Sequence, residues 1–362
     1  MSNTSLLGSY GAQDNSSLLF RNKVINGDMR IDQRNAGAKV TLDSKFGVDR
    51  FVQFIASNFF TAGLQQKTDT PPTGFSHYLR VSADTAGTAT AGQYAFLAQA
   101  IEGFNVSDLA WGTSSATAVS LSFWARSSLT GTFSGSIKNN TEDRSYVFSF
   151  SISAANTWEY KTITIPGCPD GTWDKATNAG FRISWDYGSG SARRSTAGAW
   201  LSGNFSGATG SVSLSQTLNA TLDLTGVQLE AGPTATPFER RPIGQELQLC
   251  QRYYEKSYNI DVVPGTASSN FGKFYHLASS DSAGSAGPYI QFKVTKRSTP
   301  LFTAYTDLGL AGSWRYLRSG AGADAVVNTI FIGQTGGLAF VNCGASWVPV
   351  SVHGHWTASA EL

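Results

Sequence analysis

The sequence predicts an all-β protein, and two observations carry this prediction. Only 14% of its 362 residues are charged, whereas soluble domains average about 25%. Glu, Lys and Arg usually cover helix surfaces, so their shortage argues against a mostly helical protein. Apolar and polar residues also alternate with a period of two over many short segments, which is the pattern of strands with one buried face.

The first two regions of the chain differ in pattern. Residues 1–22 are small and polar and show neither period, so we expect an extended arm that becomes ordered against a neighbouring protein. Residues 23–239 form a run of strand-like segments, and the alternation is clearest over 119–126, 145–152 and 181–187. Turn clusters separate these segments. This spacing predicts an antiparallel β-sandwich of the jelly-roll kind.

A glycine marks an irregularity in the final strand of this sandwich. The apolar residues of segment 222–230 occupy positions 222 and 224 before Gly226, and positions 227 and 229 after it. A glycine at which the inward phase shifts by one residue predicts a β-bulge. The bulge is expected to bend the strand and to re-aim Gln228 and Glu230.

Residues 240–258 are predicted to form a short helical connector. Ile243, Leu247, Cys250 and Tyr254 recur at helical spacing and indicate an amphipathic helix of about three turns. This stripe fits either a seam between copies of the chain or a helix that lies on its own domain.

A second, smaller all-β domain is predicted over residues 259–362. Val348, Val350, Val352 and Trp356 share one face of a strand, and the apolar run 326–332 is interpreted as a buried strand.

Charge and cysteine content limit the function classes. The net charge of +2 is too small to indicate nucleic acid or an anionic membrane as a partner. No apolar stretch approaches the roughly 20 residues that span a bilayer, so membrane insertion is not expected. Cys168, Cys250 and Cys343 are odd in number and far apart, so we expect reduced, buried thiols.

Several segments together resemble a widespread class of bacteriophage tail-fibre and minor virion proteins. The similar segments are 24–35 with 48–51, 121–131, 156–166, 225–241 with 244–254, and 355–362. Members of this class are similar to carbohydrate-binding modules, with a jelly-roll domain carried on an oligomeric fibre. The resemblance therefore implies a virion protein that is made in the host cytoplasm and binds host-surface glycans.

The function predicted from this resemblance is that of a non-enzymatic tail fibre or adhesin. A homotrimer is expected by analogy with fibres, and the arm 1–22 is expected to hold another virion protein. A capsid decoration protein or head fibre is the main alternative, and a polysaccharide depolymerase is the third. The sequence contains no G-x-S-x-G, H-E-x-x-H or P-loop motif, which argues against catalysis.

Aromatic side chains are the candidate glycan contacts, because flat rings stack on the apolar faces of sugars. Trp124 is out of phase with the inward residues of its strand and shares a face with Arg126, so these two form a candidate platform. Trp111, Trp173 and Trp200 lie in predicted loops. Each of the three is either a ligand contact or a plug over the end of the sandwich.

Two metal sites are considered, and no other cofactor is expected. His353 and His355 share one strand face, and the resemblance implies that such pairs can stack around a threefold axis to bind a metal. The resemblance also implies a structural Ca²⁺ near the first and last strands of the sandwich, where Asp28, Asp32 and Glu230 are oxygen ligands of the right kind.

Overall fold

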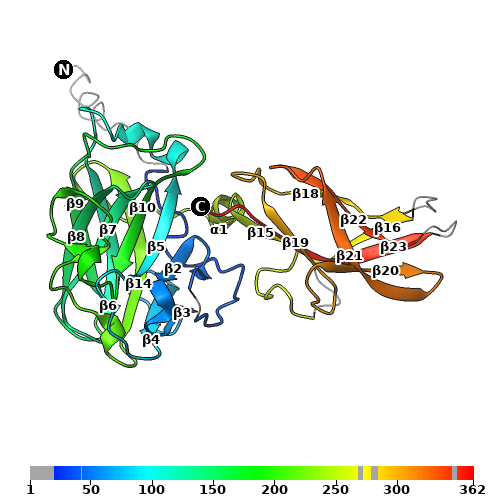
Figure 1. The fold of residues 1–362 in the computed structure, drawn as a ribbon, viewed down its shortest axis with the longest axis horizontal. Coiled ribbons are helices and arrows are strands. Elements are labelled where there is room, and N and C mark those ends of the chain that lie inside the picture. Colours follow the sequence, from blue (N-terminus) through cyan, green and yellow to red (C-terminus); the bar gives the residue numbers. More distant parts are fainter. Residues whose placement is uncertain (1–19, 42, 268–271, 279–283, 345–348) are drawn as a thin grey trace, which may run out of the picture.

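The computed structural model describes residues 20–41, 43–267, 272–278, 284–344 and 349–362. These residues form two β-rich domains on either side of a short helix (Figure 1). The prediction of an all-β protein with a jelly-roll sandwich is confirmed. Residues 1–19, and with them most of the predicted arm, lie outside the described ranges.

The larger domain is a sandwich of two antiparallel sheets. One has seven strands in the spatial order β1 (Phe46–Val48), β2 (Phe51–Ile55), β5 (Ala95–Glu102), β10 (Ala179–Asp186), β7 (Gly131–Asn139), β8 (Arg144–Ile152) and β12 (Trp200–Ser202). The other has five, in the order β3 (Ala62–Lys67), β4 (Tyr78–Ala83), β14 (Thr221–Ala231), β6 (Val119–Ser127) and β9 (Glu159–Ile165).

Short elements complete this domain. A parallel pair of two-residue strands, β11 (Arg194–Ser195) and β13 (Gly207–Ala208), lies beside the seven-stranded sheet and contacts β7 and β8. The single-turn 3₁₀ helices are η3 (Ala56–Asn58), η4 (Gly103–Asn105), η5 (Ser107–Leu109), η6 (Ser191–Arg193) and η7 (Leu214–Gln216).

One apolar core lies between the two sheets. The Phe123 ring of β6 packs edge-on against Phe150 of β8 and Trp185 of β10, at 5.1 and 5.6 Å between ring centres. Strand β6 belongs to the five-stranded sheet, whereas β8 and β10 belong to the seven-stranded sheet. The rings of Phe123 and Trp185 are completely buried. Alternation in the sequence therefore places one face of each strand in a shared core and leaves the other face of each sheet outward.

The bulge predicted at Gly226 is confirmed. The pairing of β14 with β6 shifts register between Thr225 and Gln228, and Gly226 has a φ of 61°. After the bulge, Gln228 and Glu230 point to the outer side, where both bind Thr236. A Cβ added to Gly226 would lie 2.7 Å from the Phe75 ring, so the close approach also requires glycine.

The helix α1 (Ile243–Gln251) lies at the junction between the domains (Figure 1). It packs in a small third core that includes Ile25, Ile31, Cys250, Tyr253 and the C-terminal Leu362. No helix in the described ranges is long and apolar enough to cross a bilayer.

The second domain is one connected set of antiparallel strands. Its members are β15 (Tyr254–Lys256), β16 (Phe274–Ala278), β17 (Ser285–Ala286), β18 (Tyr289–Gln291), β19 (Leu301–Tyr305), β20 (Ser313–Arg318), β21 (Ala321–Ile330), β22 (Gly336–Asn342) and β23 (Val350–Ser359). Strand β23 pairs with β15, β16, β19 and β20. Trp314, Val352 and Trp356 are central to its core.

Charged residues join the two domains. Arg252, just after α1, donates two hydrogen bonds to Glu102 of β5, at 2.6 and 2.8 Å. Glu361, near the C-terminus, pairs with Arg34 at 2.7 Å and also with Arg50. The junction is therefore held by ion pairs as well as by its apolar core.

The interpretation of 326–332 as a buried strand is wrong. Strand β21 ends at Ile330, and Val326, Ile330 and Phe331 are 69%, 40% and 87% exposed. A continuous apolar run does not show which face is inward. Only the face carrying Val327, which pairs with buried Val341, lies toward the core.

Candidate functional site

A groove on the outer face of the seven-stranded sheet gathers aromatic and charged side chains. It encloses about 230 Å³, which is less than the roughly 300–1,000 Å³ of a pocket for a drug-sized molecule. Its lining residues are Phe54, Tyr94, Phe96, Lys138, Glu142, Arg182, Arg193 and Asn204. The groove therefore fits a short part of a longer ligand.

Strand register explains why these side chains share one face. Phe54 of β2 pairs with Phe96 of β5, and Arg182 of β10 pairs with Lys138 of β7. The neighbours Phe181 and Ile137 face the sandwich core. Because successive side chains of a strand point to opposite faces, Arg182 and Lys138 point outward.

Three aromatic rings form a row along the groove. The ring centres of Tyr94 and Phe96 are 5.4 Å apart, and those of Phe96 and Phe54 are also 5.4 Å apart. Phe96 is almost fully buried, whereas Tyr94 and Phe54 are half-buried. The row therefore offers two partly open rings that flank a covered one.

Each ring of this row carries a cation. Arg193 lies 5.5 Å from the centre of the Tyr94 ring, Lys138 lies 4.8 Å from Phe96, and Arg182 lies 5.2 Å from Phe54. Cations within about 6 Å of a ring centre are attracted to its π-electrons. These contacts hold three long side chains in place over the sheet.

Lys138 is the most enclosed of these cations, with a side chain only 1% exposed. Its ammonium donates hydrogen bonds to Asn204 Oδ1 at 2.7 Å and to Ser206 Oγ at 3.4 Å. Burial lowers the Lys138 pKa from 10.5 to about 8, because a charged group is poorly solvated there. The ammonium is thus held in the groove at a cost in solvation.

Glu142 is the one carboxylate among the residues that line the groove. It accepts a hydrogen bond from Arg182 at 2.7 Å, and the Asn204 amide also donates to it. Lys138 lies farther from it, at 3.8 Å. Glu142 therefore orients Arg182 and Asn204 beside the aromatic row.

This arrangement suits a polar ligand that has apolar faces. Half-exposed rings offer flat stacking surfaces, and adjacent amide, hydroxyl and ammonium groups can bond to hydroxyl groups. A saccharide has both features.

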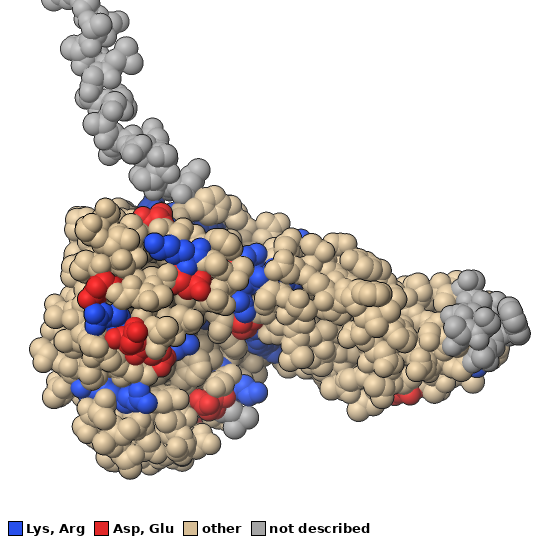
Figure 2. Space-filling view, turned by 45° about the horizontal axis from the view of Figure 1, so that its top comes forward, with Lys and Arg blue, Asp and Glu red and all other residues tan. Residues whose placement is uncertain are grey.

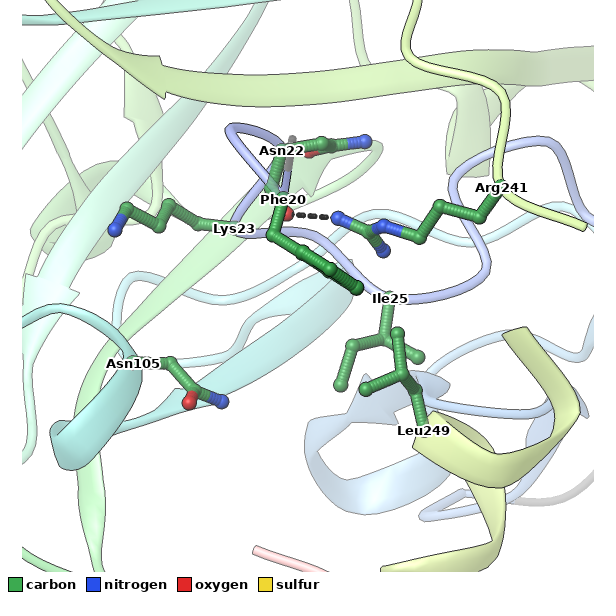
Figure 3. A pocket seen from close by; sticks show the side chains of 7 residues that line it. All are labelled: Phe20, Asn22, Lys23, Ile25, Asn105, Arg241 and Leu249. Carbon is green, nitrogen blue, oxygen red and sulfur yellow. Dashed lines mark hydrogen bonds between the residues drawn. The ribbon is translucent and has the colours of Figure 1, made fainter. Parts of the chain in front are cut away.

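A second cavity lies at the junction, where the described chain begins (Figure 3). It encloses about 130 Å³ and is lined partly by Phe20, Ile25 and Leu249. Its cations already have partners, since Arg241 donates to the Asn22 carbonyl and Lys23 pairs with Asp108 at 2.6 Å. These contacts fasten the segment after residue 19 to the sandwich.

Trp124 and Arg126 lie on the outer face of the other sheet, as their phase predicted. Trp124 is half-buried beside Tyr160, with 5.5 Å between ring centres. The Arg126 guanidinium bonds to Asp223 at 2.8 Å and to Thr70 Oγ1 at 2.8 Å. Arg126 is therefore committed to partners within the chain.

Trp111, Trp173 and Trp200 come together in one aromatic cluster at the sandwich core. Their rings meet edge-on with centres 4.8 to 5.4 Å apart, and Trp111 also stacks on Phe181. Trp111 and Trp173 are only 3% and 8% exposed. Trp111 and Trp173 are thus part of the sandwich core, and Trp200 is half-buried beside them.

The helical stripe is covered by the chain itself. Leu247 and Cys250 pack in the third core, and the Arg34 guanidinium lies 3.7 Å from the centre of the Tyr254 ring. Ile243 is 50% exposed. Three of the four residues predicted as a seam between copies thus have an intramolecular role, which is the second alternative.

The histidine pair is also enclosed within one chain. His355 stacks on Tyr258 with 3.8 Å between ring centres, and His353 Nε2 lies 3.5 Å from Asp307 Oδ2. The described residues contain no group of three or more His, Cys, Asp and Glu side chains placed to hold a metal ion.

The predicted calcium ligands are not brought together. Asp28 pairs with Arg30, Asp32 accepts hydrogen bonds from the Asn35 and Gly37 amides, and Glu230 accepts one from the Thr236 amide. Each carboxylate stabilises its own local turn.

Fold and groove together define a β-sandwich protein with an aromatic, cation-lined groove on one sheet. No family model and no curated protein matches the chain. Among solved structures, it is similar to the enzymatically active domain of tailspike protein 4 of bacteriophage CBA120, at 14% identity and a TM-score of 0.30. That match covers 58% of this chain and 21% of the tailspike chain.

Two carbohydrate-binding modules are also similar. One is the family 11 module from Clostridium thermocellum in complex with a tetrasaccharide, at 16% identity and a TM-score of 0.26, covering 54% of this chain and 98% of that one. The other is TmCBM61 in complex with galactotriose, at 8% identity and a TM-score of 0.30, covering 58% and 99%. Likeness at this level establishes no residue correspondence.

Proposed function

We propose that this chain is a non-enzymatic bacteriophage virion protein, a tail fibre or adhesin, whose sandwich domain binds a host-surface glycan. The single observation that carries the glycan site is the row of Tyr94, Phe96 and Phe54 beside the Asn204 amide and the Lys138 ammonium. The virion role is supported by the resemblance to tail-fibre and minor virion proteins noted in the sequence.

A comparison of the two outer sheet faces tests the glycan site. Tyr94→Ala removes a half-exposed ring from the groove and should weaken binding to host cells about tenfold, since ring contacts contribute roughly 0.5–1.5 kcal/mol beyond area. Trp124→Ala removes a half-buried ring from the opposite sheet and serves as the matched control. If Trp124→Ala abolishes binding while Tyr94→Ala leaves it unchanged, the site lies on the other sheet.

The absence of catalysis is part of the proposal. Glycoside hydrolysis needs two carboxyl groups about 5–10 Å apart, and Glu142, the carboxylate of the groove, is already bonded to Arg182. Incubation of the pure protein with host polysaccharide should leave its chain length constant. Shortened chains would favour the depolymerase alternative.

Self-association is proposed on the apolar outer face of the second domain. Val326, Ile330 and Tyr289 are 69%, 40% and 59% exposed there, and strand register places Leu338 between Ile330 and Tyr289. Exposed apolar side chains gathered on one face are typical of a protein interface. We propose that the occupant is a further copy of the chain in a homotrimer.

The binding partner of residues 1–22 distinguishes a tail fibre from a capsid protein. We propose that residues 1–22 bind a tail protein. Cross-linking of this segment in intact particles should capture a tail component. A cross-link to the major capsid protein would instead support a decoration protein or head fibre.

A further inference from the structure

The groove on the seven-stranded sheet has more positive than negative charge. Lys138, Arg182 and Arg193 face a single carboxylate, Glu142, among the residues that line it. Arg182 takes the close contact with that carboxylate, at 2.7 Å, whereas Lys138 stays 3.8 Å away. Two of the three cations therefore lack a close ionic partner within the groove.

Arg193 is the cation least committed to the protein. Its Nε donates to the Gly92 carbonyl at 3.2 Å, and its guanidinium lies over the Tyr94 ring. Among the described residues, no carboxylate lies within ion-pair distance of Arg193. The planar edge of a guanidinium forms paired hydrogen bonds with carboxylate or phosphate oxygens, so Arg193 is suited to an anionic ligand group.

Lys138, over the middle ring of the row, supports the same conclusion. Its hydrogen-bond partners are a neutral amide oxygen and a hydroxyl group, and its ionic contact with Glu142 is long, at 3.8 Å, although its side chain is almost fully buried. Burying a charged group is costly unless it is paired. A ligand anion in the groove would add to the weak countercharge that Glu142 supplies from 3.8 Å.

We propose that the groove binds an acidic saccharide, one that carries a carboxylate or phosphate group, with that anion held between Arg193 and Lys138. This inference rests on the proposed glycan-binding function and deepens it. The sugar ring stacks on Tyr94 or Phe54 while Asn204 bonds a hydroxyl group. A single enclosed groove in a chain of net charge +2 does not provide the extended basic track that follows a nucleic-acid backbone.

Matched pairs of sugars test the charge preference directly. The full chain is titrated with galacturonate trisaccharide and galactotriose, with sialyllactose and lactose, and with galactose 6-phosphate and galactose. At least one acidic member should bind about tenfold or more tightly than its neutral partner, as expected from one charge-assisted hydrogen bond. The affinity for this acidic member should also fall in 0.5 M NaCl, whereas the affinity for its neutral partner should not change with salt.

Arg193→Gln is the decisive variant, because this side chain lies on a surface turn and its loss should leave the sheet intact. It should lower the affinity for the acidic member more than the affinity for its neutral partner, so that the acidic preference is lost. Arg315→Gln in the second domain is the control. Equal affinity for acidic and neutral members overturns the acidic specificity but leaves glycan binding in place. No binding to any member overturns both, and binding of the phosphate member alone assigns phosphate as the anion.

Discussion

The Lys296 ammonium lies 2.5 Å from the Glu255 carboxylate, and both side chains are completely buried. Lys296 also donates to the Gln251 carbonyl at the end of α1, at 2.6 Å. This ion pair ties the end of the helix and β15 to the loop after β18.

Breaking this pair should destabilise the second domain. Lys296→Met leaves an unpaired buried carboxylate, and we expect a loss of about 3–5 kcal/mol in the free energy of unfolding. Lys293→Met, at an exposed position three residues earlier, is the control and should change it little. Denaturant unfolding of the full chain measures both, and equal effects would contradict a special role for the pair.

Gly226→Ala should destabilise the sandwich by two separate effects. Its φ of 61° strains any other residue, and the new methyl group would lie 2.7 Å from the Phe75 ring. Gly210→Ala is the control for backbone strain alone, because Gly210 has a φ of 80° and an added Cβ would have nothing within 4 Å. We expect about 1 kcal/mol for Gly210→Ala and about 2–4 kcal/mol for Gly226→Ala, measured by thermal unfolding.

Glu361→Gln should loosen the junction between the domains. The carboxylate bonds to Arg34 and Arg50, and only 11% of its side chain is exposed. We expect a loss of about 1–3 kcal/mol. Asp324→Asn removes the exposed partner of Arg315 and should change stability by less than about 1 kcal/mol. Faster proteolysis near residue 252 in Glu361→Gln would show that the junction is affected.

Binding of an acidic saccharide should weaken above pH 8. The Lys138 pKa is lowered to about 8 by burial and by nearby Arg182 and Arg193, against the opposing influence of Glu142 and Asp186. A bound anion favours the protonated ammonium and raises this pKa, so binding takes up a proton in the window between the free and bound pKa values. Affinity should be constant below pH 8 and fall by up to about tenfold per pH unit above it.

Calorimetry in buffers of different ionisation enthalpy measures this proton uptake. Lys138→Arg is the control, because a guanidinium stays charged throughout this range. A pH dependence retained in Lys138→Arg would assign it to a different group.

Charges on the exposed apolar face should dissociate the oligomer. Val326→Glu with Ile330→Glu places two carboxylates on this patch, and we expect the solution mass to fall from three times 38.6 kDa to 38.6 kDa. Light scattering coupled to gel filtration measures this, with Arg315→Gln as the control. A monomeric unmodified chain would disprove the trimer proposal.

The charge distribution agrees with glycan binding by the sandwich domain and self-association through the second domain. Figure 2 shows Lys, Arg, Asp and Glu gathered on the visible face of the sandwich domain, whereas the second domain is almost free of them in this view. A surface with few charges presents a small desolvation cost when it is covered by another protein.

The fold could be predicted because apolar and polar residues alternate in strands that have one face in the core and the other in solvent. Trp185 shares the phase of Phe181 and Ile183, and all three are buried as that phase requires. Gly226 was detectable because the phase shift and the glycine coincide. In β21 the apolar run hid the alternation, and the outward face was missed.

The groove was not predictable in the same way. Phe96 lies in a strand whose residues are nearly all apolar on both faces, so no pattern marks it as outward. Lys138 and Arg182 did carry a signal, since each directly follows an inward apolar residue. Arg193 lies in a 3₁₀ turn far along the chain, and only the tertiary fold brings it over Tyr94.

Strand β23 has a mechanical consequence. Ser359 near its end pairs with Tyr254 at the start of β15, so the chain enters and leaves the second domain at the same place. Leu362 is packed there and Glu361 is ion-paired there. A force applied to the far loops of this domain would thus reach the sandwich through two adjacent strands, β15 and β23. The covalent chain through β15 and the non-covalent contacts of Glu361 and Leu362 would share that force.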